Sequence, residues 1–430
     1  MTSSHNQALI DRRRNALGPS YSHFYNEPLY LVRGSGMRVW DNDGRQYLDC
    51  YNNVPSVGHC HPHVVEALTR QAQTLNTHTR YLHHGIVDYA EKLTATLPGD
   101  LSVCMLVCTG TEANDLAYQI AKTVTGNDGA IIIKQTYHGS STLVRELSPE
   151  ERIGGPADFV AEIDGPNPYR GPIAGDDPDF VVKYADLADG AIETLAARGK
   201  APALLMIDSI YDSPGVFTPP PAYQQQLFAK VRAAGGLIVA DEVQSGLCRL
   251  GDHYWGFMDS AVVPDIVTMG KPMGDGHPLA VLVTTPEIAE AYVKAGGDYF
   301  NTFGGNPVSA AVGTAVLEVI ENENVLANGH DTGAYFKAGL QRLKSKYDLI
   351  GDVRGKGLYY GIELVEERAT KTPAPDATRR VLEHMRQNGV LVSKIGVNAN
   401  IIKIRPPLII GKDDVDEAIA AMDAALSAAG

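Results

Sequence analysis

The chain has 430 residues and a mass of 46.2 kDa, which exceeds the size at which a single hydrophobic core usually stops growing. We therefore expect one large domain and one smaller domain. Hydrophobic residues make up 44% and charged residues 20%, proportions that exclude a disordered or fibrous chain. The formal net charge of -14 excludes a general nucleic-acid-binding surface, so any anionic substrate must be bound by a local group of cations.

Neither a membrane span nor a secretion signal is visible. No apolar run is long enough to cross a bilayer, and the first eighteen residues lack the apolar core of a secretion signal. The five cysteines are scattered and odd in number, which favours reduced thiols over a disulfide framework. These features predict a cytoplasmic protein with no membrane partner.

The first predicted elements form a β-hairpin near the start of the chain. Residues 38–40 and 46–48 alternate between apolar and polar side chains, and the turn residues 42–44 separate them. This pattern predicts two antiparallel strands. We assign residues 1–50 to the smaller domain.

The middle of the chain predicts a parallel sheet. Short apolar runs occupy residues 104–108, 130–134, 203–208, 237–241 and 266–271. Longer amphipathic segments, such as residues 223–234, lie between them. Apolar runs that alternate with helical segments are typical of a mainly parallel sheet with helices on both faces, an α/β fold. We assign residues 51–325 to this large domain.

Three of these runs end in residues that carry chemistry. About thirty residues separate Asp208 from Asp241, and about as many separate Asp241 from Lys271, the usual size of a strand–helix–strand unit. Ligands of such sheets lie beyond the carboxyl ends of the strands. We therefore expect these three side chains to converge on one crevice.

The last part of the chain has a different pattern. Residues 332–346 and 377–387 read as helices, while residues 358–364 and 401–404 read as strands. We assign residues 326–430 to a smaller α+β domain, completed by the N-terminal hairpin.

The segment Thr109–Asn114 follows an apolar run and opens a helical segment. Small residues at a helix start expose backbone N–H groups, and these can bind a phosphate. The segment is not a Walker loop, because no GxxxxGK pattern is present. A simple helix cap made by Thr111 fits this segment equally well.

Asp241 and Lys271 form the central pair of the predicted site. A carboxylate at a buried strand end needs a partner, and a cationic pyridinium nitrogen is one such partner, although capping of the next turn would also explain it. Lys271 lies between Gly270 and Pro272 after an apolar run, not on a helical face. Burial would lower its pKa and suit it to forming an imine.

At this point the sequence resembles the class III aminotransferases, enzymes of fold type I that depend on pyridoxal 5′-phosphate (PLP). The likeness covers nearly the whole chain, and it rests on the motifs TGTEAN (109–114), YHG (137–139), ADEVQSG (240–246), VTMGKPMGDGHP (267–278) and NTFGGNP (301–307).

The resemblance implies a role for each matching residue. Lys271 would form the Schiff base, Asp241 would hold the ring nitrogen, and Gln244 would lie near the ring hydroxyl. Gly110 and Thr111 would bind the cofactor phosphate, with Tyr137 over the ring and His138 beside it. Thr302 would reach the phosphate across the interface of a homodimer with shared active sites. Asp208 stands where the family usually has glutamate, so the resemblance supports its role as a cofactor ligand less directly than it supports the other roles.

A cluster of histidines raises the question of a metal. His59, His61 and His63 alternate along the chain, but no CxxC or HxxxH pair elsewhere completes a zinc site. Class III relatives carry a similar G-H-x-H-P turn. We expect no metal.

The predicted reaction depends on the substrate pocket. Class III aminotransferases that act on amino acids usually carry an arginine three residues before a Pro-Pro pair, and here that residue is Lys403. Lysine lacks the bidentate fork that grips a carboxylate. The segments 48–62, 75–84, 268–278 and 299–313 are most similar to the ethanolamine-phosphate phospho-lyase branch, of which Arg80 is characteristic.

We therefore interpret the chain as a phospho-lyase that acts on phosphoethanolamine or a related phosphorylated amine. Arg80 is the first candidate for binding the substrate phosphate, with Lys403 and Arg405 after it. A salt-bridged surface position would equally explain Arg80. The alternatives are an aminotransferase that passes an amino group to pyruvate or glyoxylate, and a protein that only binds PLP.

Overall fold

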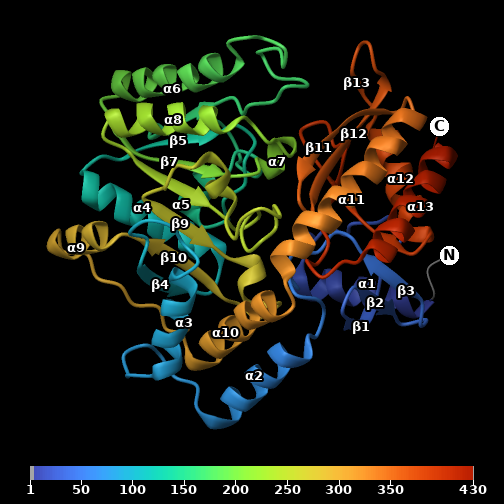
Figure 1. Ribbon diagram of the computed structural model, residues 1–430, viewed down its shortest axis with the longest axis horizontal. Helices are drawn as coiled ribbons and strands as arrows, with labels where there is room; N and C mark the ends of the chain where they lie inside the picture. The colour runs from blue at the N-terminus through green and yellow to red at the C-terminus, as the bar shows by residue number, and fades with distance from the viewer. Residues whose placement is uncertain (1–3, 430) are drawn as a thin grey trace.

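The computed structural model describes residues 4–429 and shows two bodies side by side (Figure 1). The larger body contains a seven-stranded sheet with helices on both faces. The smaller body contains two further sheets, to which both ends of the chain contribute. None of the helices within residues 4–429 is long and apolar enough to cross a membrane.

The large sheet has the strand order β4-β10-β9-β8-β7-β5-β6. β10 runs antiparallel to both of its neighbours, and the pairs from β9 to β6 are parallel. The expected α/β fold with a mainly parallel sheet is therefore confirmed. The strands are β4 (Val103–Val107), β5 (Gly129–Ile133), β6 (Val160–Ile163), β7 (Pro202–Asp208), β8 (Leu237–Asp241), β9 (Ile266–Met269) and β10 (Ala280–Thr284).

The central strands read as unbroken apolar runs because both of their faces are buried. Along β5, Ile131 and Ile133 pack in the core beneath α6 and α8, while Ala130 and Ile132 pack on the α4 side. The helices along this part of the chain are α2 (Pro62–Thr74), α3 (His84–Thr94), α4 (Gly110–Thr125), α5 (Thr142–Glu146), α6 (Phe180–Ala197), α7 (Asp212–Gly215), α8 (Pro221–Ala233), α9 (Pro286–Lys294) and α10 (Pro307–Asn322), with the 3-10 turns η1 (Gly256–Ser260) and η2 (Lys271–Gly274).

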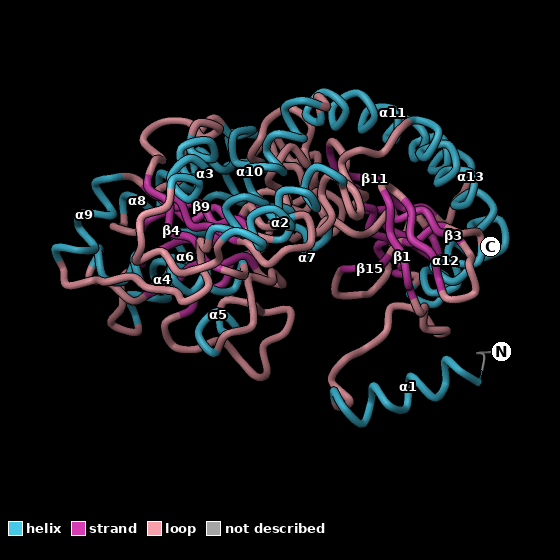
Figure 2. The backbone as a smooth tube through the Cα atoms, turned by 90° about the horizontal axis from the view of Figure 1, so that it is seen from below, coloured by secondary structure: helices cyan, strands magenta, loops and turns pink. Residues whose placement is uncertain are grey.

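The smaller body is built around two sheets, ordered β1-β2-β3-β14 and β11-β12-β16-β15, with β13 paired to β12. Their strands are β1 (Leu31–Ser35), β2 (Arg38–Asp41), β3 (Gln46–Asp49), β11 (Ile350–Lys356), β12 (Tyr359–Glu367), β13 (Thr372–Pro373), β14 (Val390–Leu391), β15 (Ser393–Ile395) and β16 (Ile401–Ile404). The helices are α1 (Ser4–Leu17), α11 (Val325–Lys346), α12 (Pro375–Gln387) and α13 (Lys412–Ala429). Figure 2 shows α1 standing outside these layers.

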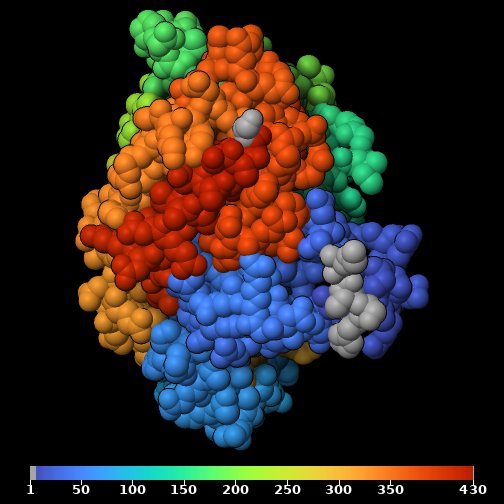
Figure 3. Space-filling view, turned by 90° about the vertical axis from the view of Figure 1, so that its right-hand side faces the viewer, coloured from blue at the N-terminus to red at the C-terminus, as the bar shows by residue number. Residues whose placement is uncertain are grey.

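The two ends of the chain meet in this body. β3 pairs in parallel with β14, and the Arg38 guanidinium binds Asp414 at 2.6 Å and Glu417 at 2.8 Å, both on α13. Figure 3 shows the N-terminal strands, in blue, lying against α13, in red. This arrangement supports our proposed division into residues 1–50, 51–325 and 326–430.

Two helical glycines test how tightly α11 is packed. A Cβ atom at Gly333 would lie 2.3 Å from the backbone oxygen of Gly357, whereas a Cβ atom at Gly190 in α6 would meet nothing within 4 Å. Alanine is the better helix former by about 1 kcal/mol. Gly190→Ala should therefore raise the free energy of unfolding by up to about 1 kcal/mol. Gly333→Ala should lower it by at least about 1 kcal/mol. Urea unfolding of both variants measures the difference, and equal stabilisation would contradict the tight packing.

Candidate active site

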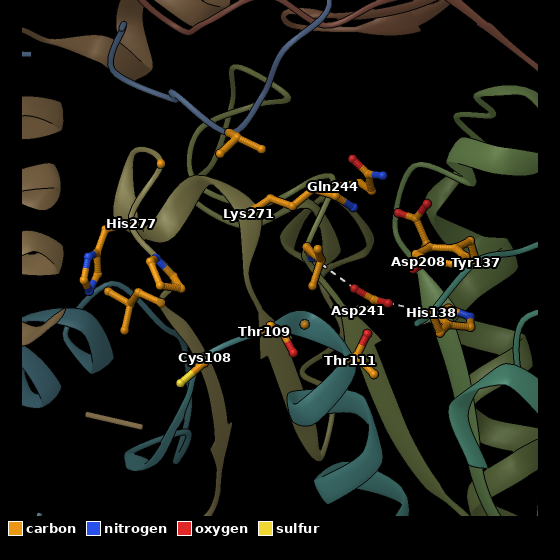
Figure 4. A pocket seen from close by; sticks show the side chains of 16 residues that line it. Cys108, Thr109, Thr111, Tyr137, His138, Asp208, Asp241, Gln244, Lys271 and His277 are labelled. Carbon is orange, nitrogen blue, oxygen red and sulfur yellow. Dashed lines mark hydrogen bonds and ion pairs between the residues drawn. The ribbon is translucent and has the colours of Figure 1, made fainter. Parts of the chain in front are cut away.

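A cavity of about 330 Å³ opens at the carboxyl ends of the central strands, beside the start of α4 (Figure 4). It brings together many residues that the sequence singles out. Those lining it are Gly110, Thr111, Tyr137, His138, Asp208, Asp241, Gln244 and Lys271.

The start of α4 leaves two backbone N–H groups free to bind an anion. The Thr109 hydroxyl accepts from the N–H of Glu112, and the Glu112 carboxylate accepts from the N–H groups of Cys108 and Thr109. The helix cap is therefore Thr109, and a cap made by Thr111 is wrong. Within residues 4–429, no hydrogen bond uses the N–H of Gly110 or Thr111, and both residues line the cavity. A helix N-terminus with free donors suits a phosphate.

Gly110 could not be replaced without disturbing the start of α4, where the free N–H groups lie. A Cβ atom there would lie 2.9 Å from Cγ2 of Val243, which also lines the cavity. Gly139 is under a similar constraint: its φ is 147°, and a Cβ atom would lie 2.6 Å from the Thr111 hydroxyl. The local backbone is therefore shaped around an open space at the end of α4.

The Asp241 carboxylate is buried and held by a network of hydrogen bonds. Its Oδ2 lies 2.7 Å from His138 Nδ1 and 2.9 Å from the donating Asn114 amide, while Oδ1 accepts from the N–H of Val243 at 3.0 Å. The Thr268 hydroxyl donates to the Asn114 oxygen at 2.6 Å and fixes that amide. Asp241 thus caps the next turn and also presents a stabilised negative charge at the cavity, which suits a cationic ring nitrogen.

Lys271 begins η2 just after the carboxyl end of β9, the parallel neighbour of β8, and its side chain lines the cavity (Figure 4). Within the described chain, no hydrogen bond or ion pair ties down its Nζ. Its pKa is lowered from the usual range, because burial disfavours the ammonium and the Arg405 guanidinium repels it. A lowered pKa makes the neutral amine more available as a nucleophile and base.

Gln244 is oriented by two donors behind the cavity wall. Its Oε1 accepts from the Asn53 amide at 3.1 Å and from the Arg405 guanidinium. The amide nitrogen of Gln244 is thereby left as a donor for the cavity. Arg405, which is buried, acts on the site through this amide and does not line the cavity itself.

The Asp208 carboxylate accepts hydrogen bonds from the backbone of the loop that follows it. Its two oxygens accept from the N–H of Ile210 at 3.1 Å and from the N–H of Asp212 at 2.7 Å. Burial raises the pKa of Asp208 well above its ordinary value, and the neighbouring Asp212 adds to this effect. The short side chain therefore braces the turn into α7, while its role as a cofactor ligand stays a prediction.

Lys403 lies in the middle of β16 and is almost completely buried. Its Nζ lies 2.7 Å from each oxygen of the Asp212 carboxylate. It does not line the cavity. Sequence reasoning missed Asp212, because a single acid in a four-residue helix carries no periodic signal.

Arg80 and Thr302 lie outside the cavity on neighbouring exposed loops. The Arg80 guanidinium stacks over the Phe300 ring at 4.0 Å, and Thr302 follows two residues later. Arg80 is exposed, and within the part of the chain that the structure describes no ion pair joins it to a carboxylate. Exposed apolar side chains surround the two loops, among them Tyr81, Leu82 and Phe303.

The three alternating histidines have separate carboxylate partners. His59 lies 2.8 Å from Asp49, His61 lies 3.1 Å from Glu323, and His63 lies 2.6 Å from Glu318. Among the described residues, no group of three or more His, Cys, Asp or Glu side chains is arranged to hold a metal.

Comparison with known proteins defines the class of this site. The family described as Aminotransferase class-III matches residues 20–426. A phospholyase from Arthrobacter, solved in complex with phosphoethanolamine, has a TM-score of 0.94 and 38% identity, covering 97% of this chain and 99% of the other.

Two curated relatives carry different names. The alanine–glyoxylate aminotransferase 2-like protein of Drosophila melanogaster is 42% identical over 95% of this chain and 84% of its own length. The ethanolamine-phosphate phospho-lyase homolog 1 of Caenorhabditis elegans is 35% identical over 98% of this chain and 93% of its own length. The chain belongs to the class III aminotransferase family, whose members depend on PLP.

The residues present fit this cofactor. Free N–H groups at the start of α4 suit its phosphate, the buried Asp241 carboxylate suits its ring nitrogen, and the unpaired Nζ of Lys271 suits its aldehyde. The Gln244 amide nitrogen is available for the ring hydroxyl.

A covalent bond to Lys271 can be tested without any substrate. Borohydride reduction of the PLP-loaded protein should fix the cofactor on one tryptic peptide containing Lys271. Lys271→Ala should lack both the fixed mass and the visible absorbance band that borohydride abolishes in the wild type. Lys294→Ala, which changes an exposed lysine on α9, is the control and should keep both. Labelling that persists in Lys271→Ala would refute the assignment.

Proposed function

We propose that this protein is a PLP-dependent phospho-lyase that acts on phosphoethanolamine or a related phosphorylated amine. With phosphoethanolamine and one water, the products are acetaldehyde, ammonia and inorganic phosphate. The substrate therefore carries a phosphate that must be bound close to the reacting amine.

One observation carries this proposal: Lys403 and Arg405 are two buried cations whose charge acts on Lys271, and among the described residues one of the two pairs with a carboxylate. Lys403 and Arg405 are each 4% exposed, and within the described chain Asp212 is the carboxylate that pairs with Lys403 while none pairs with Arg405. An uncompensated buried cation is costly. An anionic substrate group would supply the missing charge.

The pairing of Lys403 also weakens the alternative in which this residue binds the carboxylate of an amino-acid substrate. Both oxygens of Asp212 already lie 2.7 Å from its Nζ, so Lys403 is not an open cation like the arginine expected in amino-acid aminotransferases. The likeness to the Arthrobacter phospholyase, which was solved with phosphoethanolamine, supports the same conclusion.

Each residue of the cavity has a defined task in this proposal. Bound PLP would draw electrons from the carbon that bears the amino group. Lys271 Nζ removes the proton from that carbon, and its lowered pKa keeps a larger fraction neutral for the purpose. Asp241 keeps a proton on the ring nitrogen, and phosphate leaves from the adjacent carbon.

Arg80 and Thr302 enter the proposal through a second copy of the chain. Both lie outside the cavity of their own protomer, on adjoining loops with exposed apolar side chains. In a homodimer with shared sites, a loop that carries Thr302 to the partner's cofactor phosphate would bring Arg80 with it. We propose that Arg80 binds the substrate phosphate in the partner's site.

The alternative is an aminotransferase, which the 42% identity to the Drosophila relative favours. Phosphate release from phosphoethanolamine, measured without any keto acid, separates the two reactions. A phospho-lyase should release phosphate over many turnovers. Absence of phosphate together with amine transfer to pyruvate or glyoxylate would overturn the proposal.

The placement of Arg80 can be tested with mixed dimers. Arg80→Ala and Lys271→Ala should each lose most of the kcat/KM for phosphoethanolamine. If Arg80 serves the partner's site, a purified heterodimer of the two variants contains one complete site and should recover about half of the wild-type activity. If Arg80 serves its own site, the heterodimer has no complete site and should stay inactive.

A further inference from the structure

Gln244 presents an amide to the cavity, and the two ends of an amide differ chemically although they have the same shape. The nitrogen donates hydrogen bonds and the oxygen accepts them. A donor would stabilise an anionic ring oxygen of the cofactor, whereas an acceptor would repel it. The chemistry of the cavity therefore depends on which end of Gln244 faces it.

Asn53 contacts Gln244 but could not fix its orientation alone. The Asn53 amide nitrogen donates to Gln244 Oε1 at 3.1 Å. Asn53 Oδ1 is buried and, among the described residues, has no hydrogen-bond partner. If both amides turned over, Asn53 Oδ1 would accept from the Gln244 nitrogen, so the pair would keep its hydrogen bond. The turned-over pair would present the Gln244 oxygen to the cavity.

Arg405 contacts the same end of Gln244 and removes this ambiguity. Its guanidinium donates to Gln244 Oε1. A guanidinium has donors and no acceptor, so a turned-over amide would place two sets of donors against each other. With the Gln244 oxygen held by Arg405, the nitrogen is the end that faces the cavity.

Arg405 is itself fixed from several sides. It is 4% exposed, and its Nε donates to the carbonyl oxygen of Tyr51 at 3.2 Å. The guanidinium carbon lies 5.0 Å from the centre of the Tyr51 ring and 5.9 Å from the centre of the Tyr359 ring. The carbonyl oxygen of the next residue, Pro406, accepts from the Arg249 guanidinium. The guanidinium therefore reaches Gln244 from one defined position.

We propose that Arg405 is a positioning residue that keeps the Gln244 nitrogen facing the cavity and so prepares the cavity for the ring oxygen of the cofactor. Arg405 does this from outside the cavity, through an amide that lines it. The role is the same for a phospho-lyase and for an aminotransferase, so it does not depend on the proposed reaction.

The test follows the proton on the Schiff base between Lys271 and the cofactor, because its loss changes the visible absorbance of the protein. A donor from Gln244 draws charge from the ring oxygen and weakens the hydrogen bond between that oxygen and the Schiff-base proton. The proton is then lost at a lower pH. In Arg405→Met the amide can turn over, and the midpoint of the absorbance titration should rise by about one pH unit.

Loss of the Arg405 charge would also raise this midpoint, so the same substitution is made in Gln244→Leu, which has no amide to orient. Besides Arg405, the charged groups that act on Lys271 are Lys403, Asp208, Asp212 and Asp241, and all of them stay in place in these variants. If Arg405 acts through Gln244, Arg405→Met should shift the midpoint in the Gln244→Leu background by less than half as much as in the wild type. An equal shift in both backgrounds would overturn the inference, because the charge would then act directly.

Three further variants separate orientation of the amide from damage to the fold. Arg405→Lys keeps the charge and has only donors, so its midpoint should stay close to that of the wild type. Arg405→Gln can donate or accept, so it should raise the midpoint, and it replaces Arg405→Met if that protein does not fold. Lys394→Met changes an exposed side chain on β15, beside β16, and should leave the midpoint unchanged. A wild-type midpoint in the neutral variants of Arg405 would refute its role.

These titrations need no substrate, which separates them from the proposed function. If phosphate release is absent but the midpoints change as expected, the proposed reaction fails while the role of Arg405 stands. If phosphate is released but the midpoint does not respond to Arg405, the reaction stands and the positioning role fails.

Discussion

The buried carboxylate of Asp241 is the interaction on which the rest of the site depends. A carboxylate at a buried strand end loses its hydration, and hydrogen bonds must offset that cost. Here His138, Asn114 and the backbone N–H of Val243 form these hydrogen bonds. Asn114 belongs to α4 and Thr268, which fixes it, belongs to β9. The network therefore ties the anion-binding helix start, the acid and the strand leading to Lys271 into one rigid unit.

A second group of polar residues lies behind the network around Asp241. Gln244 faces the cavity, but Asn53 and Arg405 determine its orientation, and Arg405 belongs to the strand end of the smaller body. Asp208 likewise shapes the turn that delivers Asp212 to Lys403. The two bodies are thus joined at the active centre by charged contacts, and a change in their relative position would change the charge beside Lys271.

Much of the fold could be predicted because the central strands are buried on both faces. The runs ending at Asp208, Asp241 and Lys271 are mostly apolar, and their spacing predicts a strand–helix–strand unit for each interval. The first interval contains α8 as expected, but the second contains the 3-10 turn η1 in place of an α-helix. The reversed strand β10 could not be predicted, since an antiparallel strand within a buried sheet has the same apolar pattern as its neighbours.

The polar supports of the site were less visible in the sequence. Asn114 lies within the TGTEAN motif, but its hydrogen bond to Asp241 spans 127 positions and has no local signature. Asp212 and Asn53 lie in irregular turns, where neither helical nor strand periodicity applies. The positions of Arg80 and Thr302 depend on loop packing around Phe300, which a linear pattern does not specify.

The parallel pairing of β3 with β14 has a consequence for how the chain folds as it is made. Leu48 pairs with Val390 and Asp49 with Leu391, so the N-terminal sheet lacks one strand until almost the whole chain has left the ribosome. The large sheet has no such delay, because its strands come from one continuous stretch of sequence. The N-terminal hairpin therefore keeps an open edge until β14 has been made, and during that interval this edge can bind chaperones or pair with other chains.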